Sequence, residues 1–143
     1  MAKQNYLAVD LGAESGRVMA GSFDGTKMQL REMHRFPNGG IRIGGTLRWN
    51  VVQLWAEIQK GLSIAAKELG DTIVSVGVDT WGVDFVLMNE NEELLGLPYH
   101  YRDERNNGMV EAVTSIVPKA EIFAATGLQF MQINSLYLSL IHI

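Results

Sequence analysis

The stretch LAVDLGAESGR, residues 7–17, limits more than any other what this chain can fold into. An apolar run reaches Asp10, Gly12 and Gly16 bracket a polar segment, and a second apolar run begins at Val18. This order predicts a strand, a tight loop and another strand. Because glycine adopts positive φ without steric cost, we expect both glycines to let the loop turn its N–H groups towards one bound anion.

The side chains around this loop suit a phosphate group. Ser15 adds a hydroxyl donor, and Arg17 adds a planar fork of donors that matches phosphate oxygens. Asp10 would repel phosphate unless Mg²⁺ or its water shell lay between them, so the loop predicts a metal–nucleotide ligand. The segment departs from the Walker pattern, since Arg17 stands where that pattern has lysine and a strand follows in place of a helix. The alternative is a plain hairpin turn with exposed Glu14, Ser15 and Arg17.

Three antiparallel strands are predicted to open the chain. Residues 6–10, 17–23 and 27–36 carry strand patterns, and the Asp-Gly pair at 24–25 is a strong hairpin signal. This meander differs from the βαβ unit of dinucleotide-binding proteins. The glycine-rich segment 37–45 is then expected to be a mobile loop.

A helix is predicted over residues 51–69 from apolar residues recurring at intervals of three and four. Asn50 with Gln53 has the pattern of an N-terminal capping box, and Gly70 stands where a left-handed C-terminal cap is wanted. The apolar stripe of this helix includes Trp55, which is therefore expected in the core.

A second unusual stretch begins where the β-branched run 72–79 ends; that run is typical of a central strand covered on both faces. The string DTWGVDF, residues 79–85, gathers two carboxylates, a tryptophan and a glycine at the strand end where open α/β sheets bind ligands. One interpretation is a sugar or polyol site. Trp81 would face C–H groups, Gly82 would allow close backbone approach, and the carboxylates would accept from hydroxyls. The alternative is a turn in which Trp81 fills the core and the carboxylates cap backbone donors.

The remainder of the chain carries weaker signals. We expect residues 85–88 to form a strand, Arg102 and Asp103 to form an ion pair that fixes a loop, and helices to span residues 107–117 and 119–126.

Composition sets wider limits. The chain has 143 residues, 47% hydrophobic, with a net charge of −4, which allows one modest domain with a real core. The mild acidity and mixed charges argue against nucleic acid or an anionic membrane as partner. Because there are no cysteines, disulfides and thiolate metal sites are excluded. No signal peptide or membrane-length apolar run is evident, so a cytoplasmic location is expected.

The strings AVDLGAESGRVM, VDTWGVDFVL and GLPYHYRDERNNG resemble the N-terminal part of FGGY carbohydrate kinases, and LREMHRF and TGLQFMQINSLY support the match. The resemblance implies an α/β fold, the actin-like or hexokinase-like (ribonuclease H-like) ATPase domain, with a mixed sheet and flanking helices. It implies ATP and Mg²⁺ as cofactors and phosphorylation of the ketose L-rhamnulose to L-rhamnulose 1-phosphate, as in L-rhamnose catabolism. By motif, the ATP-binding loop would be Ala13, Glu14, Ser15, Gly16 and Arg17, the substrate contact Gly82, and the residue near the metal, through water, Asp10.

The resemblance also implies that residues 1–143 form an incomplete first domain. Such kinases have two domains, and their general-base aspartate would lie beyond residue 143, so no carboxylate here is assigned as catalytic and the chain alone is not expected to turn over. Residues 138–143 depart from the family's pattern, and we expect them to be a non-native tail. Two other functions stay open: an FGGY kinase acting on xylulose, fuculose or glycerol, and a non-catalytic actin-like nucleotide-binding protein.

Overall fold

The structure, a computed structural model, describes residues 4–140 and divides them into two compact units. The first unit comprises residues 4–39 and 50–81, and the second comprises residues 40–49 and 82–140. The elements, in chain order, are β1 (Gln4–Leu11), β2 (Ser15–Phe23), β3 (Met28–Pro37), β4 (Gly40–Ile43), β5 (Thr46–Trp49), α1 (Val51–Leu69), η1 (Gly70–Thr72), β6 (Ile73–Thr80), η2 (Glu104–Asn106), α2 (Met109–Thr114), α3 (Lys119–Thr126) and α4 (Ser135–Leu140).

The first unit is built on a four-stranded sheet in the order β3-β2-β1-β6. β1 pairs antiparallel with β2, and β2 pairs antiparallel with β3, which confirms the predicted meander. Gly25 takes φ of 101° in the turn that joins β2 to β3, as its Asp-Gly pair predicts. β6 returns parallel to β1, so the sheet is mixed and Leu11 lies beside Thr80 at one end of it.

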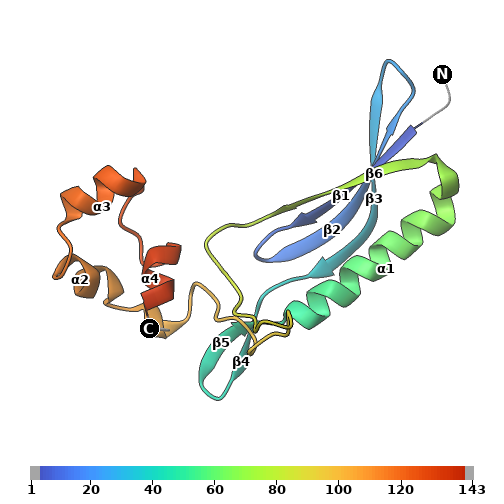
Figure 1. The fold of residues 1–143 in the computed structure, drawn as a ribbon. Helices are drawn as coiled ribbons and strands as arrows, with labels where there is room; N and C mark the ends of the chain where they lie inside the picture. Colours follow the sequence, from blue (N-terminus) through green and yellow to red (C-terminus); the bar gives the residue numbers. More distant parts are fainter. Residues whose placement is uncertain (1–3, 141–143) are drawn as a thin grey trace. The chain divides into compact units, whose positions relative to one another are not determined.

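Helix α1 packs along this sheet, and its N-terminal cap is the predicted one (Figure 1). The Asn50 side chain accepts a hydrogen bond from the Gln53 N–H at 3.1 Å. Gly70 ends the helix with φ of 51° and ψ of −136°, so its φ is positive but the predicted left-handed cap does not form. His34 on β3 donates through Nε2 to the Glu57 carboxylate of α1, and this bond lowers the pKa of Glu57 below its ordinary value.

The buried stripe of α1 consists of Leu54, Gly61 and Ala65, so the prediction that Trp55 lies in the core is wrong. Trp55 is 59% exposed. Positions seven and four residues apart share one helix face, whereas the residue next to Leu54 lies about 100° around the helix. Gly61 lies where α1 packs tightly against β2, since a Cβ built there would stand 2.4 Å from Val18 Cγ2. The small residues of the stripe therefore determine which face of α1 packs against the sheet.

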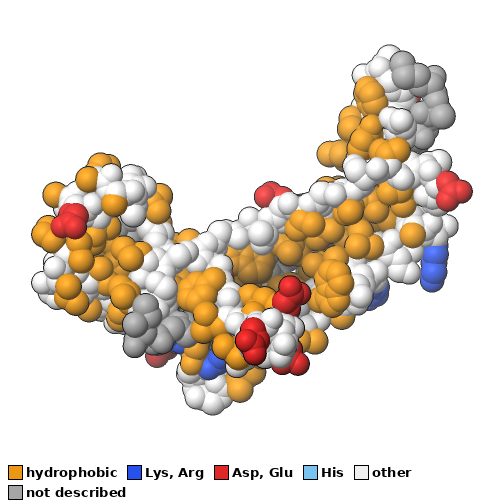
Figure 2. All heavy atoms as spheres, viewed as in Figure 1, with side chains coloured by type: hydrophobic (Ala, Val, Ile, Leu, Met, Phe, Trp, Pro, Cys, Tyr) orange, Lys and Arg blue, Asp and Glu red, His pale blue; other side chains and the backbone are white. Residues whose placement is uncertain are grey.

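β6 forms as predicted, but among the described residues the expected cover on both of its faces is missing. Val74, Val76 and Val78 are all at least half exposed, and Figure 2 shows hydrophobic side chains gathered on the exposed surface of this sheet. β6 is the last strand of the sheet order, so its edge away from β1 pairs with no other strand within residues 4–140. Its β-branched sequence indicates a strand suited to two-sided burial, which the described part of the chain does not provide.

The second unit contains a hairpin in place of the predicted mobile loop at residues 37–45. β4 and β5 pair antiparallel, and Gly44 and Gly45 connect them with φ of 56° and 83°. A Gly-Gly pair between two short strands supplies the left-handed turn that a two-residue hairpin loop needs. The glycines therefore indicate a turn, and mobility was the wrong interpretation of them.

Later elements of the second unit agree with the predictions in part. α3 covers the predicted residues 119–126, while α2 is shorter than predicted. Residues 85–88 make only an isolated bridge, Met88 with Leu94, so the strand predicted there is wrong. The Asp103 carboxylate does fix its loop, but it accepts from backbone N–H groups of Leu47 and Arg105 and not from Arg102.

Two further observations concern the chain as a whole. Within residues 4–140, no helix is both long and apolar enough to cross a membrane. The tail expected to be non-native begins inside α4, and its residues 141–143 lie outside the described residues.

Candidate functional site

The loop between β1 and β2 is a tight turn held by its own backbone. The Gly12 N–H donates to the Ser15 carbonyl at 3.0 Å, which closes the turn. Within residues 4–140, the N–H groups of Ala13 and Glu14 have no hydrogen-bond acceptor. Two adjacent N–H groups at the tip of a fixed turn are donors that a phosphate oxygen can bind.

Asn38, directly after β3, braces this turn from outside. Its N–H donates to the Glu14 carbonyl at 3.0 Å, and its Nδ2 donates to the Gly12 carbonyl at 2.7 Å. Both carbonyls are thereby drawn to the Asn38 side of the loop. Sequence analysis missed this residue because segment 37–45 was interpreted as mobile; the Pro-Asn-Gly-Gly string is the signal that marks a structured turn.

The two loop glycines have a different role from the one predicted. Neither Gly12 nor Gly16 is among the glycines with positive φ. A Cβ on Gly16 would instead stand 2.3 Å from the Phe36 ring, and a Cβ on Gly12 would stand 3.0 Å from the Ser15 carbonyl oxygen. Glycine is required here because neighbouring atoms fill the space that a side chain would need.

Asp10 and Arg17 face each other across β1 and β2 and form an ion pair. Arg17 Nε donates to Asp10 Oδ2 at 2.7 Å, and the two side chains are 42% and 37% exposed. The strand register makes them direct partners. The predicted phosphate ligand and the predicted metal-side carboxylate are therefore adjacent, and within residues 4–140 only Nε of the guanidinium has a hydrogen-bond partner.

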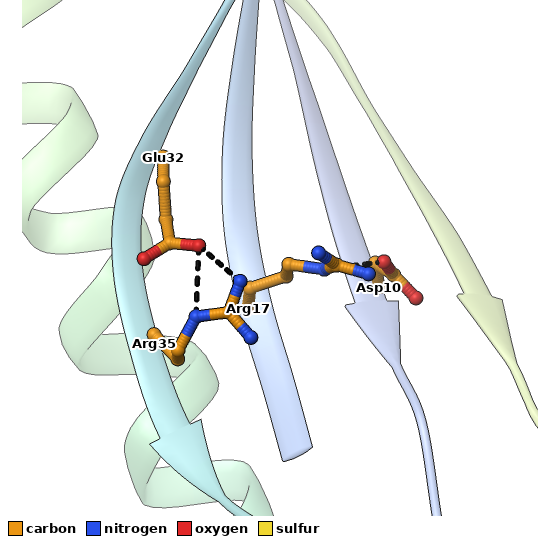
Figure 3. A network of polar contacts seen from close by, with 4 residues as sticks. All are labelled: Asp10, Arg17, Glu32 and Arg35. Atoms are coloured by element: carbon orange, nitrogen blue, oxygen red, sulfur yellow. Dashed lines mark hydrogen bonds and ion pairs between the residues drawn. The ribbon is translucent and has the colours of Figure 1, made fainter.

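The next residue of this cross-strand row is Arg35 on β3, which is the register partner of Arg17 (Figure 3). Arg35 donates through Nε and Nη2 to the Glu32 carboxylate at 2.9 and 2.5 Å. That pairing lowers the pKa of Glu32 and raises the pKa of Arg35. The fork of Arg35 is therefore occupied by a neighbour, whereas Arg17 keeps terminal donors for a ligand.

The fit of this site to Mg²⁺ follows from its donors. Within the described part of the chain, no three His, Cys, Asp or Glu side chains gather into a group that could hold a metal ion. Mg²⁺ is commonly bound through one or two carboxylates together with water and substrate phosphates. Asp10 is half exposed beside a turn with available N–H donors, which suits this mode of Mg²⁺ binding. The same residues do not suit a metal site made of protein ligands alone.

The stretch at residues 79–85 leaves the end of β6. The Trp81 N–H donates to the Leu11 carbonyl at 3.2 Å, which continues the pairing of β1 with β6, and the Trp81 side chain is half-buried. A Cβ built on Gly82 would meet no atom within 4 Å. The backbone at Gly82 is therefore open to close approach, as a substrate contact requires. Asp84 caps a donor, as the alternative interpretation has it, but the donor is the Trp49 side chain, at 2.7 Å.

The profile of the FGGY family of carbohydrate kinases, N-terminal domain, matches residues 5–140. The chain belongs to the FGGY family of carbohydrate kinases. A rhamnulokinase of Bacteroides thetaiotaomicron is 46% identical over 135 residues, which is 94% of this chain and 28% of that protein. A rhamnulokinase of Lactiplantibacillus plantarum is 44% identical over 134 residues, 94% of this chain and 27% of that protein. The chain thus spans little more than a quarter of the length of these FGGY relatives.

Solved FGGY-type kinases confirm the fold. A gluconate kinase from Lactobacillus acidophilus superposes with a TM-score of 0.79 at 12% identity over 95% of this chain and 27% of that one. A ligand-bound xylulose kinase from the same organism gives a TM-score of 0.79 at 13% identity over 96% of this chain and 28% of that one. The predicted α/β, actin-like fold with a mixed sheet and flanking helices is confirmed.

The residues predicted for the FGGY site fall into two groups. Asp10 and the loop from Ala13 to Arg17 lie together in the first unit, at the end of the sheet where the parallel strands β1 and β6 terminate. Gly82 begins the second unit. Besides Asn38, sequence analysis missed Ser135, whose Oγ donates to the Val83 carbonyl at 2.7 Å. No local signal marks that contact, because the two residues are 52 positions apart.

Proposed function

We propose that this chain is the nucleotide-loop part of a sugar kinase that transfers the γ-phosphoryl group of ATP to L-rhamnulose. The observation that carries the proposal is the identity of 44–46% to rhamnulokinases over nearly the whole chain. The donors of the loop support it from the structure. The proposed location is the cytoplasm, where ATP and a free ketose are both present.

In this proposal the phosphates of ATP lie against the turn between β1 and β2. The N–H groups of Ala13 and Glu14, the Ser15 hydroxyl and the terminal nitrogens of Arg17 donate to phosphate oxygens. Gly16 lets β2 approach Phe36 closely and so fixes the turn. Asp10 would hold Mg²⁺ through water, and the ion supplies charge neutralisation of the phosphates when bound.

The sugar would lie against the backbone at Gly82. A primary hydroxyl oxygen of the ketose forms the new bond to the γ-phosphorus, the bond from that phosphorus to the ADP oxygen breaks, and the hydroxyl proton passes to a general base, a role that we assign to no carboxylate of residues 4–140. The chain's own residues bind and orient; phosphoryl transfer through a loose transition state depends mainly on such positioning.

A chimera tests the proposal. This chain replaces the matching segment of the Bacteroides thetaiotaomicron rhamnulokinase, and kcat/KM is measured for L-rhamnulose, L-fuculose, D-xylulose and glycerol. We expect L-rhamnulose to be preferred at least about tenfold, a difference of about 1.4 kcal/mol in transition-state binding. A folded chimera that prefers another substrate, or that phosphorylates none, would contradict the proposal.

Arg17 provides the sharpest test of the loop itself. Arg17→Ala in the chimera should weaken ATP binding about tenfold to hundredfold, because a charge-assisted hydrogen bond contributes about 1.5–3 kcal/mol. Arg35→Ala is the matched control: it removes the neighbouring arginine, whose fork is already occupied by Glu32, and should leave ATP affinity unchanged. Isothermal titration with an ATP analogue that resists hydrolysis measures both, and equal effects of the two substitutions would refute the assignment.

A further inference from the structure

Val83, directly after Gly82, has a backbone conformation that its side chain disfavours. Its φ is 75°, and it is one of two non-glycine residues with positive φ within residues 4–140, the other being Glu92 in an acidic turn. A β-branched residue in this region is a true outlier, because its side chain is crowded against the backbone. Such a conformation persists only where surrounding contacts hold it.

Two contacts from distant parts of the second unit hold this turn. Ser135, the first residue of α4, donates through Oγ to the Val83 carbonyl at 2.7 Å. Trp49, the last residue of β5, donates through Nε1 to Asp84 Oδ2 at 2.7 Å.

The Trp49 anchor is rigid. Its side chain is only 1% exposed, and its ring stacks on that of His100 with centroids 4.0 Å apart. A donor held this firmly fixes the Asp84 side chain, while the Ser135 hydroxyl fixes the preceding peptide group. Both contacts therefore hold the chain directly after the Cα of the strained residue, at the Val83 carbonyl and at the Asp84 side chain.

We propose that Ser135 and Trp49 are positioning residues that hold the turn at residues 82–84 in the strained conformation that presents the Gly82 backbone to the sugar. The inference rests on the proposed function, since it assigns how one part of that sugar site is preorganised. Neither side chain needs to touch the substrate. Because they act on the sugar side alone, their loss should change sugar binding and leave ATP binding as it was.

Steady-state kinetics of the chimera test this. Ser135→Ala should raise the KM for L-rhamnulose about threefold to tenfold, the equivalent of one lost hydrogen bond, with the KM for ATP unchanged. Ser135→Thr keeps the hydroxyl and should restore the parent value. Ser139→Ala is the matched control, because that hydroxyl donates to the Leu136 carbonyl of its own helix and to nothing else within residues 4–140, so its loss should change neither KM.

A glycine at residue 83 separates positioning from a merely structural role. Val83→Gly removes the strain, so the clamp is no longer needed, and Ser135→Ala in that background should change the sugar KM less than about twofold. An undiminished effect in that background would overturn the proposal. So would a folded Ser135→Ala variant whose sugar KM equals that of the parent.

Trp49→Phe supplies an independent arm, since it keeps an aromatic ring to stack on His100 and removes the Nε1 donor together with part of the indole ring. It should raise the sugar KM by a similar factor, and a parent-like KM would contradict the role of Trp49. These outcomes differ from failure of the proposed function, in which the unsubstituted chimera phosphorylates no L-rhamnulose at all.

Discussion

Gly61→Ala sets helix propensity against tertiary packing. Gly61 lies in the middle of α1, where alanine favours the helix by about 1 kcal/mol over glycine. In the structure, however, the new Cβ would stand 2.4 Å from Val18 Cγ2 and 3.2 Å from His34 Cβ. Val18 is fully buried, so neither it nor the helix can move aside freely.

The packing effect should win. Ordinary contact requires the Val18 methyl group and the new Cβ to separate by about 1 Å, and overpacking of this kind costs about 1–3 kcal/mol. Lifting α1 by that amount would also loosen the cluster of Leu7, Ala20 and Ala65, because such a gap forfeits a quarter to a half of each contact's attraction. We therefore expect a packing cost of about 3 kcal/mol. After the gain in helix propensity of about 1 kcal/mol, the free energy of unfolding should fall by about 2 kcal/mol, which is about 30-fold in the unfolding equilibrium.

Urea unfolding of the full chain, followed by circular dichroism, measures this loss as a lower midpoint at unchanged slope. Ser63→Ala is the control at an exposed position of the same helix, and it should stabilise by a few tenths of a kcal/mol. Combining Gly61→Ala with Val18→Ala should cost less than the sum of the two, because the second substitution removes the clashing methyl groups. If Gly61→Ala alone were as stable as the unsubstituted chain, the close approach of α1 to β2 would be refuted.

Gly82→Ala should leave the urea midpoint unchanged, since its Cβ meets open space, yet raise the sugar KM of the chimera; a changed midpoint or an unchanged KM would contradict the assignment. Gly16→Ala should lower the free energy of unfolding by about 1–3 kcal/mol through its clash with Phe36, which the urea midpoint would report as a decrease. An unchanged midpoint would count against that packing. Burial, and secondarily Arg102, lower the pKa of His100 below 6.5, so stability should be full above pH 6.5 and fall as the pH drops towards the folded-state pKa; His100→Gln should flatten that slope.

Much of the turn between β1 and β2 is predictable from sequence because it depends on neighbours along the chain. An apolar run, a glycine-bounded polar segment and a second apolar run define the hairpin, and pairing of β1 with β2 then places Asp10 opposite Arg17. The reason for glycine at residue 16 was not predictable, since it lies in the Phe36 ring on another strand. The hydrogen bonds from Asn38 to the loop were not predictable for the same reason.

The turn after β6 was less accessible to prediction from sequence. The DTWGVDF string marks a turn after a strand, and a Cβ built on Gly82 meets no atom within 4 Å, while the substrate contact at Gly82 stays a prediction. That Val83 is strained, and that Ser135 and Trp49 hold it, depends on residues far apart in the chain.

Local sequence signals are enough to define the strands of the meander, the Asp-Gly turn, the N-terminal cap of α1 and the bounds of α3, because backbone preferences and side-chain periodicity act over a few residues. Tertiary structure alone decided that Leu54 and not Trp55 is buried, that Gly16 and Gly61 are needed for space, and that β6 exposes its valines. These outcomes follow from which surfaces meet, and close packing of distant segments is not encoded in any short stretch of residues.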